Sequence, residues 1–172
     1  MVGFSSPREL LFMPIDPQQT IYYKKARFTT RLPVDRLYSQ AHFWLTEEEP
    51  GIWRIGLTRF ATRMLGDFVE LRFEVLPGGD LEPGQIVGSI EGFKAVSDIY
   101  SVMHGEFVGS NLELERDPVL LDRDPYELGW LYRVRGRPPE TSMDVHGYIG
   151  LLDATVERML QEQKQAPDDK TC

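Results

Sequence analysis

The sequence has little of what disulfide-linked, metal-binding and membrane proteins need. Its single cysteine, Cys172, cannot form an internal disulfide. The three histidines, His42, His104 and His146, do not have the spacing of metal ligands. No run of about 18 apolar residues occurs, which excludes a membrane-spanning helix. We therefore expect a cytoplasmic, reduced protein that holds no metal and contacts no membrane.

Sequence motifs of common enzymes are also missing. The chain has no Gly-x-Ser-x-Gly, no phosphate-binding loop and no dinucleotide-binding fingerprint. The apolar run from Leu10 to Met13 ends at Pro14, so it is too short for the core of a secretory leader. These absences favour a protein whose function does not depend on an active site of its own.

The charge is acidic and unevenly distributed. The net charge is −8, which argues against nucleic acid as the main partner. Residues 1–37 carry a net charge of +3, which leaves −11 for the rest of the chain. An acidic body suits docking on basic enzyme surfaces, but the same charge can simply keep the protein soluble. Both interpretations stay open at this point.

One stretch, residues 91–101, organises the rest of the chain. Apolar and polar residues alternate before and after Lys94, from Ile86 to Ile90 and from Val96 to Tyr100. This period of two predicts two short strands that meet at residues 93–95. The tip of such a hairpin would present Lys94 to solvent on a well-fixed backbone.

The remaining pattern is mainly β. We expect further strands over residues 37–45, 52–58, 67–76, 106–110 and 129–135. A short helix is expected over residues 59–65, with Thr58 as its N-cap and Gly66 as its stop. Another short helix is expected over 117–121, and a longer one from Asp144 towards the C-terminus. Residues 21–30 predict an added strand, which we expect either on the edge of the sheet or against a partner.

The lysine stretch and several other motifs resemble the glycine cleavage H-protein family. Glu91, Lys94 and the following residues through Ser101 are similar to the lipoyl-lysine hairpin of that family. The other similar segments are Leu37–Ser39 with His42 and Trp44, Gly56–Thr58, Leu65–Asp67, Gly105–Glu106, Asp124–Tyr126 and Gly129–Leu131. The resemblance covers residues 32–160 and implies a barrel-sandwich hybrid, in which two small antiparallel sheets are joined by short helices and followed by a C-terminal helix. It predicts an N-terminal extension over 1–31, a carrier domain over 32–162 and a C-terminal tail over 163–172.

The resemblance also implies which residues handle the cofactor. Lys94 would carry lipoate covalently, while Glu91, Gly78 and Gly105 would help a lipoate-attaching enzyme to recognise the hairpin. Biotin carriers usually flank their lysine with methionines, whereas Phe93 and Ala95 flank Lys94 here, so lipoate is favoured. Asp98 would hold the amino group of the cargo.

The chain departs from the family pattern beside this site. The family usually has a serine and a glutamate where this sequence has Ala41 and Phe43. Those two side chains would share the cargo amine with Asp98, so their absence leaves Asp98 as the remaining acceptor.

The function implied by the resemblance is that of a monomeric carrier, not an enzyme. It would shuttle an aminomethyl group and reducing equivalents among glycine decarboxylase, aminomethyltransferase and dihydrolipoyl dehydrogenase. The departures leave open a lipoate-binding carrier of another pathway, such as lipoate-linked sulfur oxidation or lipoyl relay. An unmodified interaction module is a third possibility, against which the intact Lys94, Glu91 and Asp98 argue.

Overall fold

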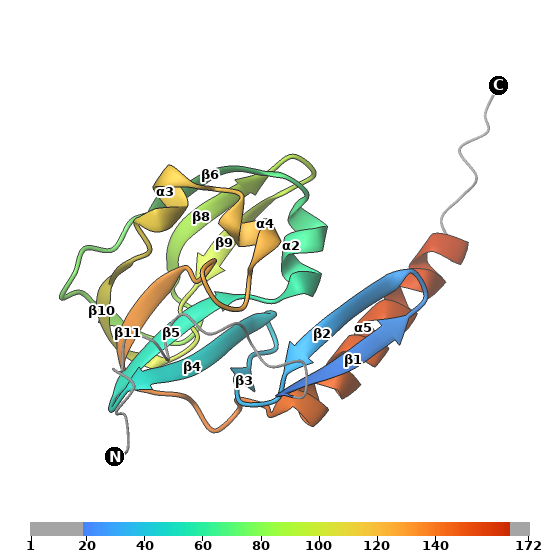
Figure 1. Cartoon of the computed structure of the whole chain (residues 1–172), viewed down its shortest axis with the longest axis horizontal. Helices are drawn as coiled ribbons and strands as arrows, with labels where there is room; N and C mark the ends of the chain where they lie inside the picture. Colours follow the sequence, from blue (N-terminus) through green and yellow to red (C-terminus); the bar gives the residue numbers. More distant parts are fainter. Residues whose placement is uncertain (1–18, 166–172) are drawn as a thin grey trace, which may run out of the picture.

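The computed structural model describes residues 19–165, which form three antiparallel sheets, three short helices and one long helix (Figure 1). The largest sheet has six strands in the order β3 (Leu37–Tyr38), β4 (Phe43–Glu49), β5 (Ile52–Leu57), β11 (Tyr132–Arg137), β10 (His104–Ser110) and β7 (Asp80–Leu81). The second sheet contains β6 (Phe68–Phe73), β8 (Ile86–Gly92) and β9 (Val96–Tyr100). This mainly β architecture of small antiparallel sheets with a C-terminal helix confirms the predicted fold class.

The main hydrophobic core is shared by the two larger sheets. Because side chains alternate between the faces of a strand, each sheet turns one apolar row inward. The six-stranded sheet contributes Phe43, Leu45, Ile55, Leu57, Phe107 and Val134, and the three-stranded sheet contributes Ile90 and Ile99. The predicted turn over residues 93–95 is confirmed, since β8 ends at Gly92 and β9 begins at Val96.

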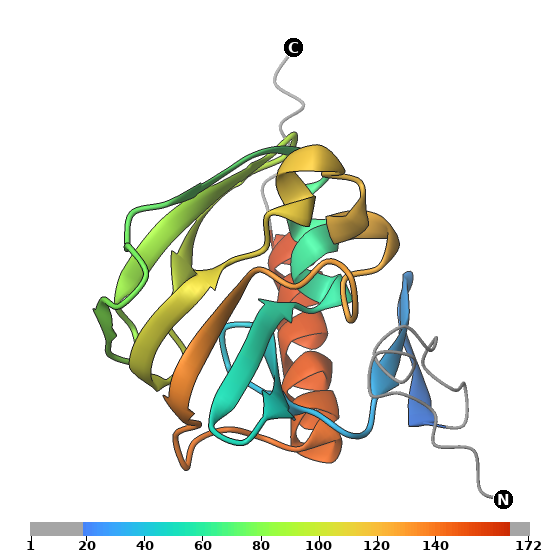
Figure 2. The same ribbon diagram turned by 60° about the vertical axis from the view of Figure 1, so that its left-hand side comes forward.

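The short helices lie together at one end of the sheets (Figure 2). Helix α2 (Arg59–Leu65) forms as predicted: the Thr58 hydroxyl accepts from the Ala61 N–H, and Gly66 ends the helix with a φ of 74°. The prediction of one helix over 117–121 is wrong. The chain forms α3 (Glu113–Arg116) and α4 (Leu120–Arg123) instead, because the residue before Pro118 cannot easily be helical.

The predicted first strand is also divided. Residues 37–45 form β3 and β4 with a tight turn between them, closed by a hydrogen bond from the Ser39 N–H to the Phe43 carbonyl. His42 adopts a φ of 66° in this turn, a backbone conformation that few non-glycine residues adopt.

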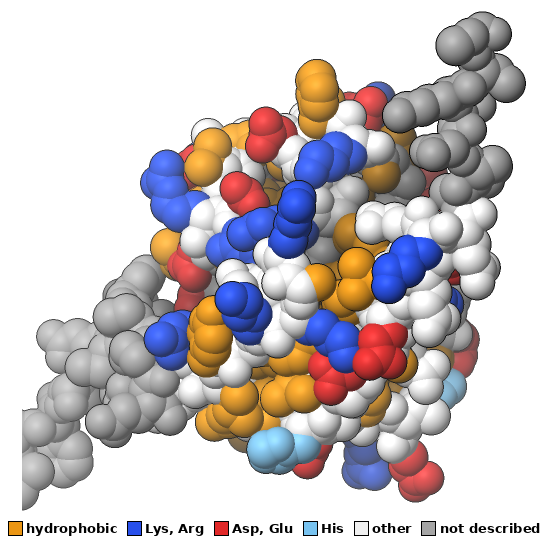
Figure 3. Space-filling model, turned by 90° about the vertical axis from the view of Figure 1, so that its right-hand side faces the viewer, with side chains coloured by type: hydrophobic (Ala, Val, Ile, Leu, Met, Phe, Trp, Pro, Cys, Tyr) orange, Lys and Arg blue, Asp and Glu red, His pale blue; other side chains and the backbone are white. Residues whose placement is uncertain are grey.

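Residues 20–33 form a hairpin rather than one added strand. β1 (Thr20–Lys25) pairs only with β2 (Phe28–Pro33), so the expected position on the edge of the main sheet is wrong. The hairpin packs instead on α5 (Val145–Gln165), where the Tyr23 hydroxyl donates to Asp153 at 2.9 Å. Figure 3 views the molecule from the side on which the hairpin and α2 lie.

A second core joins this hairpin to the main body. It includes Tyr23 and Leu32 from the hairpin, Trp44 from β4 and Leu152 from α5. Strand β2 continues across the predicted boundary between residues 31 and 32. The division into an extension, a carrier domain and a tail remains a prediction. Its C-terminal part lies partly outside the described residues.

Deleting residues 1–31 provides a test of this division. We expect the shortened chain to unfold cooperatively, because the main core is untouched, but with a free energy of unfolding lower by about 2–5 kcal/mol since Tyr23 leaves the second core. Thermal unfolding followed by circular dichroism measures this. A chain lacking only residues 1–18 keeps the hairpin and is the matched control. Loss of the cooperative transition in the shorter chain would show that the body cannot fold alone.

Candidate functional site

The turn between β8 and β9 is held by backbone hydrogen bonds to the end of α2. The N–H of Phe93 donates to the Asp67 carbonyl at 2.7 Å, and the N–H of Lys94 donates to the Leu65 carbonyl at 2.9 Å. The Lys94 side chain is exposed, and within residues 19–165 it has no hydrogen-bond or ion-pair partner. The backbone of this lysine is therefore fixed while its amine is accessible to a reactant.

Two glycines allow the turn to approach the helix so closely. A Cβ at position 92 would lie 2.2 Å from the Leu65 carbonyl oxygen, and a Cβ at position 66 would lie 2.8 Å from Cγ of Lys94. Gly92 also closes the turn, because its N–H donates to the Ala95 carbonyl at 2.8 Å. Any side chain at either position would push the lysine turn away from α2.

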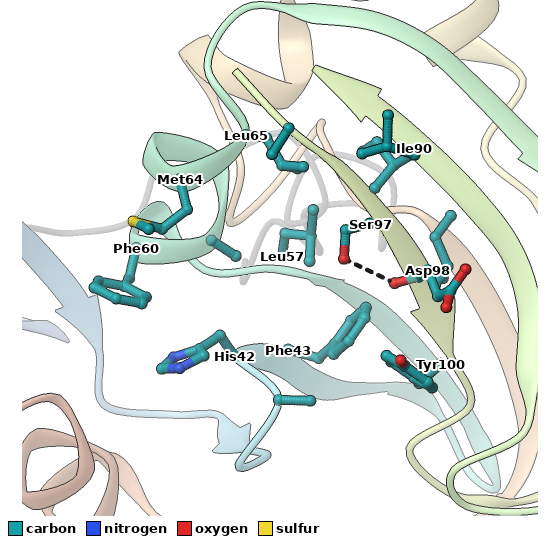
Figure 4. Close-up of a pocket in the computed structure, with 15 residues that line it drawn as sticks. His42, Phe43, Leu57, Phe60, Met64, Leu65, Ile90, Ser97, Asp98 and Tyr100 are labelled. Atoms are coloured by element: carbon teal, nitrogen blue, oxygen red, sulfur yellow. Dashed lines mark hydrogen bonds between the residues drawn. The ribbon is translucent and has the colours of Figure 1, made fainter. Parts of the chain in front are cut away.

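A largely apolar cleft of about 350 Å³ begins beside the lysine turn (Figure 4). One wall is β9 with the preceding Ala95, and the opposite wall is α2, which contributes Ala61, Met64 and Leu65. Phe43, Leu57 and Ile90 line its base. From Val96 to Tyr100 the cleft follows β9 for about 13 Å, given the rise per residue of a strand.

His42 links this cleft to the second core. Its Nδ1 lies 2.9 Å from the Tyr148 hydroxyl, which in turn lies 2.8 Å from the Thr58 hydroxyl. The His42 ring also packs on Phe60, with 4.6 Å between ring centroids. Burial, with a smaller contribution from the positive charge of Arg158, lowers the pKa of His42 to about 4. The imidazole is therefore neutral at pH 7 and adds no cation to the cleft.

The cleft offers few acceptors for a positively charged group. Ala41 supplies none, and Phe43 is only 2% exposed and packs in the main core. The Ser97 hydroxyl donates to the Asp98 carbonyl at 3.2 Å, and Figure 4 shows the Asp98 carboxylate on the other side of β9 from this hydroxyl. Asp98 lines the cleft as a residue and is exposed, so its carboxylate is open to water.

The structure brings together three of the five residues that the sequence singles out. Lys94, Glu91 and Asp98 lie on one hairpin, and all three side chains are exposed. Gly105 lies in β10, and Gly78 precedes β7, where its N–H donates to the Phe107 carbonyl of β10 at 2.8 Å, so neither glycine lies on the lysine hairpin. Both adopt positive φ, at 92° and 155°. The roles of Glu91, Gly78, Gly105 and Asp98 towards a cofactor remain predictions.

Sequence reasoning identified the lysine but not the contacts that hold it. It assigned Gly66 only as a helix stop and gave Gly92 no role. The sequence does contain a signal, which is the position of the two glycines. Gly92 lies two residues before Lys94, and Gly66 ends the helix that precedes the lysine turn. Within residues 19–165, no group of three or more His, Cys, Asp or Glu side chains could hold a metal ion, and no helix is long and apolar enough to cross a membrane.

Comparison with known proteins gives one consistent result. A family model described as "Glycine cleavage H-protein" matches residues 36–151. The glycine cleavage system H protein of Corynebacterium jeikeium is 40% identical over 124 residues, which is 69% of this chain and 95% of that protein. The H protein of Thermus thermophilus is 35% identical over 126 residues, or 72% of this chain and 97% of that protein.

A solved structure is similar over the same region. The crystal structure of a glycine cleavage system H protein from Mycobacterium marinum matches with a TM-score of 0.64 and 30% sequence identity. The match covers 71% of this chain and 99% of the other. The similarity therefore spans nearly the whole length of these relatives and leaves part of this chain outside.

Replacing Gly92 with alanine tests the contact between the turn and α2. We expect Gly92→Ala to lower the free energy of unfolding by about 1–3 kcal/mol, because the new methyl group collides with the Leu65 carbonyl. The amides of Phe93 and Lys94 should exchange hydrogen faster, as measured by NMR. Gly109→Ala is the matched control, since a Cβ there meets no atom within 4 Å. Equal stability and equal exchange in the two variants would contradict this role.

Proposed function

This chain belongs to the glycine cleavage H-protein family, and from this premise we propose that it is a lipoyl carrier of the glycine cleavage system with lipoate attached to Lys94. As a carrier it would move an aminomethyl group and reducing equivalents between the enzymes of that system on the lipoyl-lysine arm. No observation in the structure favours a carrier of another pathway.

The observation that best supports this proposal is the combination of a fixed, exposed lysine with an adjoining cleft. The amine of Lys94 is accessible while its backbone is hydrogen-bonded to the end of α2. The cleft starts at the next residue, Ala95, and runs along β9. An arm anchored on Lys94 therefore has an apolar surface to lie against, and such a surface shelters its reactive end from water.

Attachment changes the charge of Lys94 as well as its length. The neutral amine attacks the carbonyl of an activated lipoyl donor held by an attaching enzyme, an amide C–N bond forms, and the donor's leaving group departs as the nitrogen loses its proton. The lysine then no longer carries a positive charge. When bound, lipoate supplies the dithiolane whose sulfur atoms accept and release the cargo. This chain supplies the anchor and the cleft, and no protein thiol is needed.

The partners follow from the same proposal. A lipoate-attaching enzyme would modify the chain, and glycine decarboxylase, aminomethyltransferase and dihydrolipoyl dehydrogenase would use it. We further propose that the chain acts as a monomeric, cytoplasmic carrier without an active site of its own. The low cysteine content and the lack of enzyme motifs in the sequence support this assignment.

The departures at Ala41 and Phe43 affect how firmly the cargo is held. An ammonium has three donors, and a single exposed carboxylate at Asp98 leaves most of them to water. Without acceptors in the cleft, burial of this ammonium is unfavourable. We therefore propose that the amine-loaded arm spends more time outside the cleft than it would with a serine and a glutamate at these two positions.

Modification of Lys94 can be tested directly by intact mass. Incubation with a lipoate-attaching enzyme should add one lipoyl group to the wild-type chain and none to Lys94→Arg, because arginine cannot form the amide. Lys24→Arg, which changes an exposed lysine on β1, is the matched control and should gain the full mass. A lipoyl group on Lys94→Arg, or a wild-type chain that is never modified, would refute the assignment.

Restoring the two acceptors should lengthen the lifetime of the amine-loaded arm. We expect Ala41→Ser with Phe43→Glu to slow the loss of cargo about 3- to 10-fold, as one or two additional hydrogen bonds hold the ammonium. Lipoylated protein is loaded with labelled glycine by the decarboxylase, and release of the label is followed over time.

Because Phe43 packs in the main core, the thermal unfolding of the double mutant is measured in parallel. Ala41→Ser alone changes only an exposed site and is the control that keeps the core intact. If the wild-type chain retains the label as long as the folded double mutant, the missing acceptors do not matter.

A further inference from the structure

A line of cationic side chains leads to Lys94 across the face that carries α2 and the β1–β2 hairpin. Figure 3 shows Lys and Arg side chains gathered over the middle of this face. A cavity of about 380 Å³ beside the lysine turn is lined by Lys94, Arg59 and Arg63. A second cavity of about 300 Å³ shares Arg59 with the first and is also lined by Arg31 and Arg123. We call these five residues the basic face.

The positive charge of this face is poorly neutralised. The two cavities contain three carboxylates, Asp67, Asp122 and Asp124, against the five cations. Asp122 is already paired with Arg59, at 3.2 Å. Arg63 and Arg123 are exposed, and neither has a hydrogen-bond or ion-pair partner within residues 19–165. A local excess of positive charge therefore lies beside Lys94 in a chain whose net charge is −8.

This arrangement is unfavourable for the isolated fold. Arg59 is the first residue of α2, where the partial positive charge of the helix N-terminus favours acidic side chains, and the first turn has none. Arg59 and Arg63 are also four residues apart on the helix, a spacing at which like charges repel. Helix charges that depart from the favourable pattern in this way tend to mark functional surfaces.

Exposed apolar side chains surround the same turn. Phe93 is 84% exposed and Val96 is 70% exposed, on either side of the lysine. Met64 of α2 is 47% exposed. A protruding aromatic residue beside arginines has the composition of a protein–protein interface rather than of a small-ion site.

We propose that the basic face is the docking surface for the enzyme that acylates Lys94, and that this enzyme presents carboxylates to Arg63 and Arg123 and an apolar pocket to Phe93. This inference rests on the proposed function. An unmodified lysine side chain is short, so the acylating active site must come close to the turn itself. Arg63 lines the same cavity as Lys94, so an enzyme that reaches this lysine also comes within the short range over which its charges act on Arg63.

The acidity of the whole chain suggested the opposite kind of partner. A net charge of −8 would favour a basic enzyme surface, but steering depends on the charges next to the docking site. In the two cavities beside Lys94, by contrast, the five cations outnumber the three carboxylates. The enzyme that reaches this lysine is therefore expected to be acidic around its active-site entrance.

Reversing two charges of the basic face tests the proposal. The initial rate of acylation by a lipoate-attaching enzyme from the same organism is measured by intact mass, as a function of ionic strength. For Arg63→Glu with Arg123→Glu we expect kcat/KM at low salt to fall about 10-fold or more, and the deficit to shrink as salt screens the interaction.

The matched control is Lys24→Glu with Lys164→Glu, which changes the net charge equally. Both lysines are exposed, Lys24 on β1 and Lys164 in the last turn of α5, and neither lines the two cavities. This pair should change kcat/KM by less than about 2-fold. Thermal unfolding shows whether each variant is folded, and Arg63→Gln with Arg123→Gln, which removes charge without reversing it, should give an intermediate loss.

The outcomes separate this inference from the proposed function. A wild-type chain that is never acylated overturns both. A chain that is acylated normally, at a rate that neither folded variant of the basic face changes, overturns the docking surface alone. Equal losses in the basic-face variant and the control also overturn it, because the effect would then follow net charge and not position.

Discussion

The position of Lys94 depends on one contact, the packing of its turn against the end of α2. Two backbone hydrogen bonds and two glycines make this contact possible, because the chains approach more closely than a Cβ would allow. The same contact also sets the width of the cleft, since α2 forms one wall and the strand after the lysine forms the other. Anchor and cleft are therefore positioned together.

Helix α2 is in turn held at its start by the second core. Thr58 caps the helix and its hydroxyl is hydrogen-bonded to Tyr148 of α5, which also contacts His42 at the edge of the cleft. Tyr148 is fixed by stacking on Tyr38, with 4.6 Å between ring centroids. A continuous path of packed and hydrogen-bonded groups thus runs from the C-terminal helix through α2 to the lysine. The hairpin on α5 strengthens the far end of this path.

Sequence patterns predicted the features that depend on local structure. Alternation located the lysine turn, and Thr58 with Gly66 located α2, because strand period and helix caps are properties of neighbouring residues. They did not predict that residues 20–33 fold back as a hairpin, which depends on the positive φ of Ala26 and on burial against a helix more than 100 residues later. Sequence patterns could not predict the basic face either, because its residues come from four separate segments that only the fold brings together. Net charge does not reveal this cluster of cations, because it averages over the whole chain.

The basic face also affects the carrier after Lys94 has been acylated. Formation of the amide removes the charge of Lys94, so the face loses one of its five cations at the moment when the attaching enzyme has finished. In the docking that we propose, this weakens attraction to an acidic enzyme and favours release of the modified carrier. The remaining arginines repel an ammonium near the turn, and the cleft provides few acceptors to offset that repulsion. An uncharged arm is not repelled by these arginines and needs no acceptors in the cleft. The same electrostatics therefore favour a sheltered arm without an amine and an exposed arm with one.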